Sequence, residues 1–541
     1  MWTDIAKRKQ DSILGGIPPE WRDAEIADKM QRTGETNTKR FLDATLPEDE
    51  NAITHLSLVD LQKKIAAGEF SALEVTTAYC HRAALAHQIV NCCSDIFFDE
   101  AFERAKKLDQ VFAKDGVVGP LHGIPISLKD QVDLTGKDST LGYCSLADKP
   151  KAKNALIADQ LLEAGAVFYV KTAVPSSLMA SETYSNLIGY TTNSLHLDFS
   201  AGGSSGGEGS LIAAGASPCG LGTDIGGSIR IPSCFQGLYA LKPANGRLSY
   251  MNVTNASSGQ ECVISAIGPM ARSLEDVKYV SKVLVGMEGW HLDPKVLAVP
   301  WREEAQRKFT IGIWHACPEL RPQPPVARAL EETKAALQKA GHEVVDIQIP
   351  MLLKAMDTAT KAYVADAGKE AYGECSKTGE PFIKAALECV PWDLFGKPLD
   401  ASAWWEVCNE AYEIKQDFYA HWKDTARLTL SGKPIDAIVC PIWPVPAVLK
   451  YGPNTENYTV PFNLFDCAST VLPVGKVDKL RDVKETQFKA RNDAEQSVYD
   501  MYDPEKFHDL PVCLQVVTRK LEEERSLAVA EALDQAVHAS R

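Results

Sequence analysis

Short apolar segments alternate with helical patterns in the central third of the chain. Residues 125–128 form a short apolar segment, and residues 155–164 have the spacing of an amphipathic helix. Residues 167–170 then predict a buried strand, and residues 208–214 predict another helix. This alternation is typical of an α/β sheet covered by helices on both faces, which narrows the range of possible folds.

The first 55 residues have a different character from the rest of the chain. They are polar and contain Pro18, Pro19 and Pro47, so we expect an N-terminal helical extension, residues 1–55, with one or two helices lying on the main body. Residue Ser57 can cap a following helix, because Leu58, Leu61 and Ile65 then share one face.

The remaining residues, 56–541, show no low-complexity linker. Helical patterns cover residues 71–86, 326–340 and 404–422, and residues 437–440 predict a further buried strand. A length of 541 residues would allow about two to four domains. Without a break in composition, we expect one large domain.

Composition and charge exclude several classes of function. The net charge is −15, with 72 acidic against 57 basic side chains, which opposes phosphate binding and argues against a nucleic-acid partner. No signal-peptide pattern opens the chain, and no run of about 18 apolar residues predicts a membrane span. The fourteen cysteines are scattered and contain no CxxC pair, so we expect a cytoplasmic protein without a metal site.

Two segments rich in glycine and serine, residues 202–207 and 220–230, stand out. Tight turns or a flexible linker are one interpretation, since glycine adopts positive φ at little cost. The apolar residues 211–214 and 229–241 follow directly, which argues against a linker. Phosphate binding is another interpretation, but the spacing misses G-x-G-x-x-G and no Gly-Lys-Ser/Thr follows.

A serine hydrolase is the third interpretation. Residues 203–207 fit the G-x-S-x-G pattern of α/β-hydrolases, with Ser205 as the nucleophile. The match is weak in so glycine-rich a segment. It also requires a downstream acid and histidine, and none of the later histidines lies in a distinctive motif.

Several segments, taken in order, resemble the amidase signature family of serine hydrolases. Gly-Ile-Pro-Ile-Ser-Leu-Lys-Asp, ending at Asp130, is similar to the family's lysine segment. Residues 202–207 are similar to its Gly-Gly-Ser-Ser-Gly-Gly segment, and residues 222–232 to its nucleophile segment. Further residues that are similar to the family lie within 268–272, 436–446, 463–473 and 510–512. The resemblance covers roughly residues 75–520 and, overall, is greatest to fungal acetamidases.

The resemblance implies a Lys-Ser-Ser triad. Ser228 would be the nucleophile, Ser204 would relay the proton and contact the substrate, and Lys129 would be the base; the family usually has a cis peptide before the relay serine. The base must be a neutral amine, which burial favours because it disfavours the ammonium form. The oxyanion would be bound by the N–H groups of Ile225, Gly226, Gly227 and Ser228, where one donor is typically worth ~3–4 kcal/mol.

Five further residues near the triad receive supporting roles. Gly203 and Ser205 would support the serine segment, and Asp224 with Arg230 would brace the nucleophile loop as an ion pair or through hydrogen bonds. Met179 falls where the family places a residue of the acyl pocket, although packing in the core is an almost equal alternative.

The family implies a mixed, twisted β-sheet flanked by helices on both sides, with the triad where loops meet the edge of the sheet. It implies hydrolysis of a small-molecule amide to the acid and ammonia without metal or organic cofactor, and a small aliphatic or aryl amide as substrate. Three alternatives remain: a glutaminase like the one in glutamine-dependent tRNA amidotransferases, a fatty acid amide hydrolase, and a scaffold that keeps only the fold. A homodimer is compatible with the sequence, which does not set the oligomeric state.

The substrate pocket is the least determined part. We expect loops such as 250–262 and 440–465 to form its walls. The sequence gives the composition of these loops but not the shape of the pocket. Trp404, Trp405 and Trp443 suggest either an aromatic pocket or, more simply, packing. The family commonly has glycine where Cys513 and Thr518 stand here and proline where Ala201 stands, and these departures affect the expected pocket edge rather than the triad.

Overall fold

One mixed sheet forms the centre of the computed structural model, which describes residues 1–540. Eleven strands of the described chain follow one another in this sheet in the order β1 (Cys93–Ile96), β3 (Val167–Thr172), β2 (Pro125–Lys129), β6 (Cys219–Asp224), β8 (Ala266–Ala271), β7 (Tyr239–Lys242), β12 (Ala468–Lys476), β13 (Pro511–Thr518), β11 (Ala437–Pro441), β9 (Thr310–Ile313) and β10 (Glu343–Asp346). A separate hairpin pairs β4 (Tyr184–Ser185) with β5 (Gly189–Tyr190).

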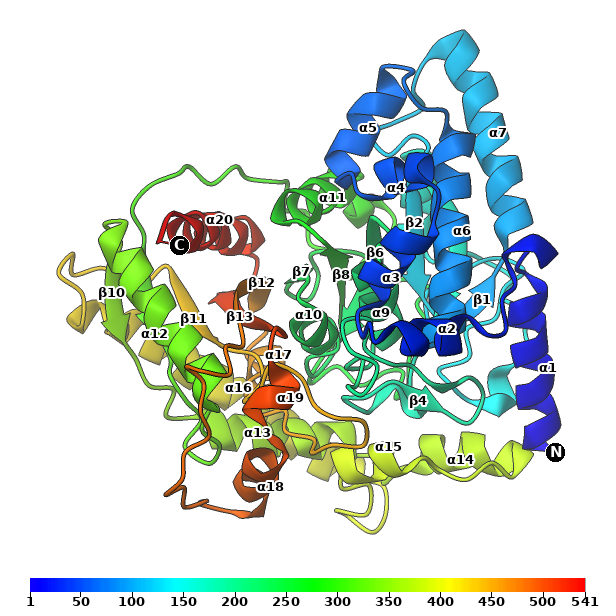
Figure 1. Cartoon of the computed structure of the whole chain (residues 1–541). Coiled ribbons are helices and arrows are strands. Elements are labelled where there is room, and N and C mark those ends of the chain that lie inside the picture. The colour runs from blue at the N-terminus through cyan, green and yellow to red at the C-terminus, as the bar shows by residue number, and fades with distance from the viewer. Residues whose placement is uncertain (541) are drawn as a thin grey trace.

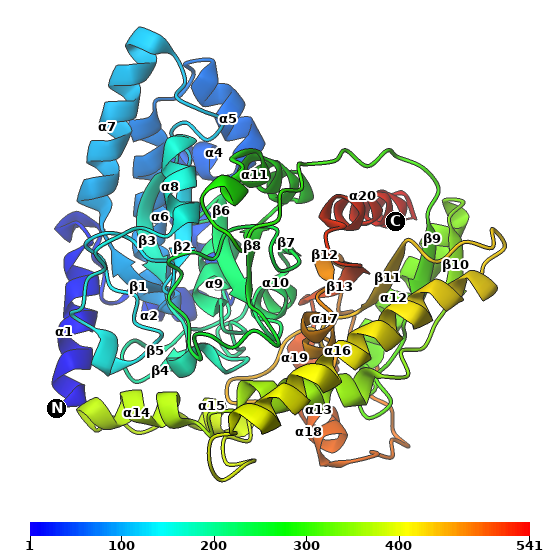
Figure 2. The ribbon, with the colours of Figure 1, turned by 180° about the vertical axis from the view of Figure 1, so that it is seen from behind.

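Helices lie on both faces of this sheet (Figures 1 and 2). In chain order they are α1 (Trp2–Gly15), α2 (Ile26–Thr33), α3 (Thr38–Thr45), α4 (Glu48–Thr54), α5 (Leu58–Ala66), α6 (Ala72–Val90), α7 (Phe98–Asp115), α8 (Leu156–Glu163), α9 (Gly206–Ala213), α10 (Arg230–Gln236), α11 (Leu274–Gly286), α12 (Pro324–Lys339), α13 (Leu352–Tyr363), α14 (Lys369–Thr378), α15 (Lys384–Cys389), α16 (Ala401–Asp424), α17 (Val460–Leu464), α18 (Asp493–Met501), α19 (Pro504–Phe507) and α20 (Glu523–Ser540). In Figure 1, α6 and α9 lie in front of the strands, whereas Figure 2 shows α8 on the opposite face. The predicted mixed sheet with helices on both sides, in one large domain, is confirmed.

The strands pair both parallel and antiparallel. β2 pairs in parallel with β3 and β6, and β9 pairs in parallel with β10 and β11, while the strands from β6 to β11 in the sheet order pair antiparallel. Ser127 is opposite Gly220 and Leu128 is opposite Leu221. The carboxyl ends of β2 and β6 therefore lie side by side at one edge of the sheet.

The predicted elements appear close to their expected places. The helix after Ser57 is α5, and the Ser57 Oγ accepts a hydrogen bond from the Asp60 amide at 3.0 Å. α6 begins after Ser71 with a capping box, in which Ser71 and Glu74 each accept from the other's backbone amide. These caps satisfy N–H groups that have no partner inside the helix.

Four α-helices, α1 to α4, form residues 1–55, all of which the structure describes, where we expected one or two. The reason lies in local start signals. The Asn37 side chain accepts from the Arg40 amide at 3.1 Å and opens α3, and α4 begins directly after Pro47. The buried Arg82 of α6 donates to Asp43 and, at 3.0 Å, to Asn51, which joins this segment to the main body. The boundary at residue 55 stays a prediction.

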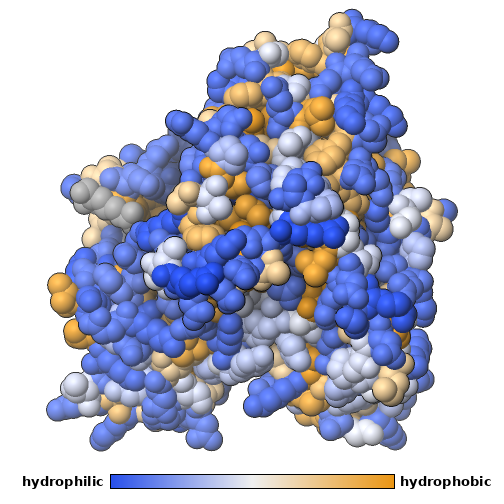
Figure 3. Space-filling view, turned by 45° about the vertical axis from the view of Figure 1, so that its right-hand side comes forward, coloured by the Kyte–Doolittle hydropathy of each residue, from blue (hydrophilic) through white to orange (hydrophobic). Residues whose placement is uncertain are grey.

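The outer surface carries mostly polar side chains on the side drawn in Figure 3, with apolar residues in separate patches. Within residues 1–540, no helix combines the length and the apolar character that crossing a membrane requires.

Candidate active site

Lys129 occupies the last position of β2, a strand whose five residues are all buried. Its Nζ donates to Ser204 Oγ at 2.8 Å and to Thr223 Oγ1 at 2.7 Å. Burial lowers the pKa of Lys129 to about 7, although the carboxylates of Asp224 and Asp130 oppose this shift. At neutral pH the amine therefore has a substantial neutral fraction and is in hydrogen-bonding distance of a serine hydroxyl.

Ser204 and Ser228 line the same small cavity, which has a volume of about 20 Å³ and is also bordered by Thr223 and Met179. The peptide bond between Gly203 and Ser204 is cis, as the resemblance implies. Ser228 is 8% exposed, and its hydroxyl has no hydrogen-bonding partner in the described part of the chain. The predicted triad residues thus lie together, with the Ser228 hydroxyl left free at the cavity wall.

The loop from residue 225 to residue 228 lies beside this cavity, and its two end residues line it. The Gly227 amide donates to Asp224 Oδ1 at 2.9 Å, so it is already engaged. Within residues 1–540, the amides of Ile225, Gly226 and Ser228 donate to no acceptor. Gly227 has a φ of +134°, and a Cβ there would lie 2.7 Å from Thr459 Oγ1, so both backbone and space require glycine.

Asp224 and Arg230 form a fully buried ion pair below this loop. Arg230 Nε donates to Asp224 Oδ2 and Nη2 donates to Oδ1, each at 3.0 Å. Burial by itself would raise the pKa of Asp224, but Arg230 holds that pKa well below its usual range. Asn463 and Thr459 accept further hydrogen bonds from the guanidinium, at 2.6 and 3.0 Å. The pair fixes the loop and takes no place in the cavity wall.

Ser204 and Ser205 are both buried, but only Ser204 lines the cavity. The Ser205 amide donates to the Ser228 carbonyl at 3.2 Å and its hydroxyl donates to the Thr223 carbonyl at 3.3 Å. These contacts place Ser205 as a brace between the two glycine-rich segments rather than as the nucleophile of an α/β-hydrolase. Gly203 is required for space, since a Cβ there would lie 2.6 Å from the Ala180 carbonyl oxygen.

A larger cavity of about 200 Å³ continues from Ser228. Its lining combines apolar side chains, among them Met179, Met356, Val390 and Val460, with polar ones such as Asn454. Met179 therefore lines the cavity next to Ser228, and its role in an acyl pocket stays a prediction. A second hollow of about 410 Å³ opens on the other side of Ile225 and includes residues from 250–261. The two loop regions that we expected to form the substrate pocket, 250–262 and 440–465, each line one of these two hollows.

The three tryptophans considered for an aromatic pocket lie elsewhere. Trp443 is buried and packs edge-on against Phe235, with ring centroids 5.6 Å apart. Trp405 is 65% exposed, and Trp404 lines a separate surface hollow next to Tyr363. Trp443 therefore packs in the core, which was the simpler of the two alternatives.

Sequence reasoning missed several residues around the lysine. Thr223 Oγ1 accepts from Lys129 and donates to Gln131 Oε1 at 2.7 Å, and Gln131 Nε2 donates to Tyr250 at 2.9 Å. Thr223 stands inside the glycine-rich motif, so its proximity to Ser228 could have been noticed. Glu456, which lines the larger cavity, carries no motif that could have indicated it.

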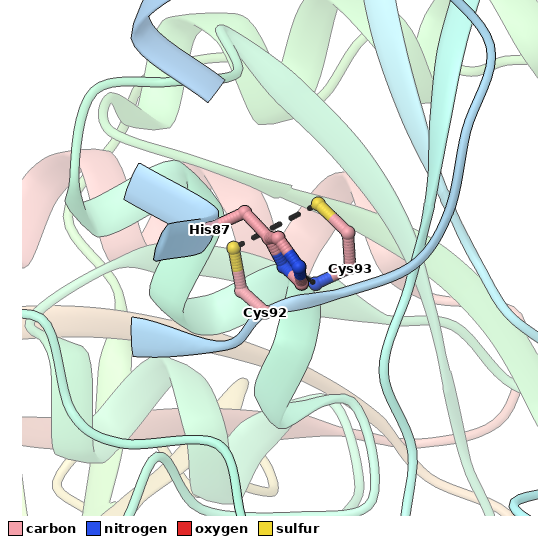
Figure 4. Close-up of side chains that lie close together, drawn as sticks. All are labelled: His87, Cys92 and Cys93. Atoms are coloured by element: carbon pink, nitrogen blue, oxygen red, sulfur yellow. Dashed lines mark hydrogen bonds between the residues drawn. The ribbon is translucent and has the colours of Figure 1, made fainter. Parts of the chain in front are cut away.

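A cluster of possible metal ligands lies away from the cavity. Figure 4 shows His87, Cys92 and Cys93 close together between α6 and β1, with the two sulfurs 3.9 Å apart. His87 Nδ1 accepts a hydrogen bond from the Cys93 amide at 3.1 Å, which uses the lone pair that a metal would need. All three side chains are buried, and their contacts are those of a packed core.

Comparison with known proteins agrees with this geometry. The family model described as Amidase matches residues 74–527. An acetamidase of Emericella nidulans is 37% identical over 546 residues, covering 98% of this chain and 97% of the relative. A probable amidase of Saccharomyces cerevisiae is 36% identical, covering 96% and 95%. A solved structure of a fatty acid amide hydrolase matches with a TM-score of 0.92 and 31% identity, covering 99% of this chain and 95% of that one. The chain therefore belongs to the amidase family and is an amide hydrolase.

Proposed function

We propose that the protein hydrolyses a small amide, R–CO–NH2, with Lys129, Ser204 and Ser228 as its catalytic triad. The observation that carries the proposal is the hydrogen bond of 2.8 Å from the buried Lys129 Nζ to Ser204 Oγ, together with the cavity that Ser204 and Ser228 share. A buried amine without a partner carboxylate favours its neutral form and can accept a proton.

In the first half of the reaction, Ser228 Oγ attacks the amide carbon. Its proton passes through Ser204 to the neutral Lys129, and the carbonyl oxygen becomes an oxyanion. The protonated lysine then returns a proton, through Ser204, to the departing nitrogen. Ammonia leaves, and the acyl group stays on Ser228 as an ester.

In the second half, water attacks the acyl-Ser228 ester, and the same lysine and serine remove its proton. The ester bond to Ser228 breaks, the Ser228 oxygen regains a proton, and the carboxylic acid leaves. In both halves the oxyanion is bound by the backbone amides of Ile225, Gly226 and Ser228. These amides lie beside the nucleophile and have no other acceptor in the described chain. Gly227 holds the loop in shape through Asp224.

A small aliphatic or aryl amide is the substrate we propose, as for an acetamidase. The relatives named acetamidase align over nearly the whole chain, and the cavity next to Ser228 has a volume of about 200 Å³. Pockets for drug-sized ligands are typically about 300–1,000 Å³, so this cavity suits a short acyl group. Taken alone, this cavity is too small for a fatty acyl chain, which would also need the hollow of about 410 Å³ beside Ile225.

The amidotransferase-type glutaminase is the other alternative. The relatives named acetamidase align with nearly the whole chain, and this supports an amidase rather than an amidotransferase-type glutaminase. We also propose a cytoplasmic location, for which the unpaired state of the fourteen cysteines is supporting evidence.

Ammonia release from a panel of amides tests the proposal. The panel runs from acetamide and longer aliphatic amides to benzamide, indole-3-acetamide and glutamine, with Ser228→Ala as the control. We expect turnover of at least one amide other than glutamine, and its loss in Ser228→Ala. Release from glutamine alone, or equal release by Ser228→Ala, would overturn the proposed function.

A further inference from the structure

A carboxyl group lies in the cavity that continues from Ser228. Glu456 and Ser228 line this cavity together. Glu456 Oε2 is 3.5 Å from the point that a Cβ on Gly226 would occupy, so the carboxyl lies beside the loop that we propose for oxyanion binding. An acyl group attached to Ser228 and extending into this cavity would therefore pass close to Glu456.

The two oxygens of Glu456 differ in their contacts. Oε1 accepts a hydrogen bond from the Cys389 thiol at 3.3 Å, and a thiol is a weak donor. Oε2 has no hydrogen-bonding partner within residues 1–540, and no cationic side chain there forms an ion pair with Glu456. One carboxylate oxygen thus faces the cavity with its acceptor sites unused.

The surroundings offer no internal counter-charge. Among the described residues that line this cavity there is no lysine, arginine or histidine. The nearby Arg230 is committed to Asp224 by two hydrogen bonds, and the Tyr363 hydroxyl donates to the Ile225 carbonyl at 2.6 Å. Burial raises the pKa of Glu456 to about 7. Glu456 is only partly buried, but a carboxylate that is partly removed from water and has no cationic partner is costly, and a cation placed next to it removes much of that cost.

We propose that Glu456 determines specificity by selecting amides whose acyl chain ends in an ammonium group. The inference rests on the proposed function, because it places the acyl group of the Ser228 ester in this cavity. The apolar walls, including Met179, Met356 and Val460, suit the methylene groups of a short chain. The Glu456 carboxylate then binds the terminal ammonium by a charge-assisted hydrogen bond.

Three amides with equal numbers of non-hydrogen atoms test this: 4-aminobutanamide, 4-hydroxybutanamide and pentanamide. Their kcat/KM values are measured for the wild type and for Glu456→Gln at about pH 8, where the carboxylate is ionised. We expect the wild type to prefer 4-aminobutanamide over pentanamide by about tenfold or more, and Glu456→Gln to lose that preference. The value for pentanamide shows whether the loss is confined to the charged substrate.

Glu388→Gln is the matched control, because this carboxylate is exposed on the same helix as Cys389, α15, and does not line the cavity. It should keep the wild-type preference. An unchanged preference in Glu456→Gln would overturn the proposal, as would a wild type that prefers the uncharged 4-hydroxybutanamide.

A failure of this inference can be distinguished from a failure of the proposed function. If the wild type hydrolyses none of these amides, the proposed function fails for short aliphatic substrates. Binding of 4-aminobutanamide to Ser228→Ala, measured by calorimetry, then decides the inference by itself. We expect binding to weaken by about tenfold when Glu456→Gln is added. Equal binding by the two proteins would overturn the role of Glu456.

Discussion

Lys129 and Arg230 are two buried residues with basic side chains near the Ser228 loop, and they have different neighbours. Arg230 has a carboxylate partner, Asp224, in two hydrogen bonds of 3.0 Å, and further acceptors in Asn463 and Thr459. Lys129 has only two hydroxyl groups, those of Ser204 and Thr223. One cation is neutralised by an anion, and the other is not.

The difference assigns them different tasks. A guanidinium with a bidentate carboxylate stays charged and fixes geometry. A lysine amine in a site without a paired carboxylate has its pKa lowered, here to about 7, so its proton can leave and return. We therefore expect Arg230 to hold the loop in position, and we propose that Lys129 carries the proton.

Lys129→Met should have the largest effect on activity. Methionine keeps the apolar stem but cannot accept a proton, so kcat/KM for a small amide should fall by about 10⁴-fold. The free energy of unfolding should change by no more than about 1–2 kcal/mol, because no partner carboxylate is left unpaired. Steady-state ammonia release and denaturant unfolding measure the two quantities. Activity above about a tenth of wild type would contradict the role of the lysine.

Arg230→Met should instead reduce stability. It leaves the Asp224 carboxylate buried without its counter-charge, so the free energy of unfolding should fall by about 3–5 kcal/mol. Urea unfolding followed by circular dichroism gives this value. Arg427→Met serves as the control, since the Arg427 side chain is 81% exposed and should matter little. A loss below about 1 kcal/mol for Arg230→Met would remove the distinction between the two cations.

Thr223→Val should have a smaller effect on activity. Valine keeps the shape but removes the hydroxyl that accepts from Lys129 Nζ, so the amine is less well positioned. We expect kcat/KM to fall by about five- to tenfold, the scale of one hydrogen bond. The same change at the exposed Thr45 should leave kcat/KM unaltered. An unchanged kcat/KM in Thr223→Val would show that Ser204 alone positions the lysine.

The resemblance to the amidase signature family predicted Lys129, Ser204 and Ser228 from three short segments, and the structure brings these residues together. Long-range partners could not be predicted. Asn463 binds Arg230 across 233 positions of sequence, and Glu456 enters the cavity from a loop without a motif.

The fold shows the same limit. Strands with a continuous apolar run, such as β3 and β11, were predicted from the sequence. β6 and β8 were not predicted, because they contain glycine or proline, and these residues are typical of turns. Close packing explains them here, since a Cβ at Gly220 in β6 would lie 2.4 Å from Ser127 Oγ.

The pH dependence of kcat/KM tests most directly whether Lys129 acts as a neutral base. Below its pKa of about 7 the lysine is an ammonium and cannot accept a proton. For a small neutral amide between about pH 5 and 10, we therefore expect kcat/KM to rise about tenfold per pH unit and level off above pH 7. Glu456→Gln should keep this rise, which separates Lys129 from the cavity carboxyl. A flat profile, or a rise centred near the ordinary lysine pKa, would contradict the account.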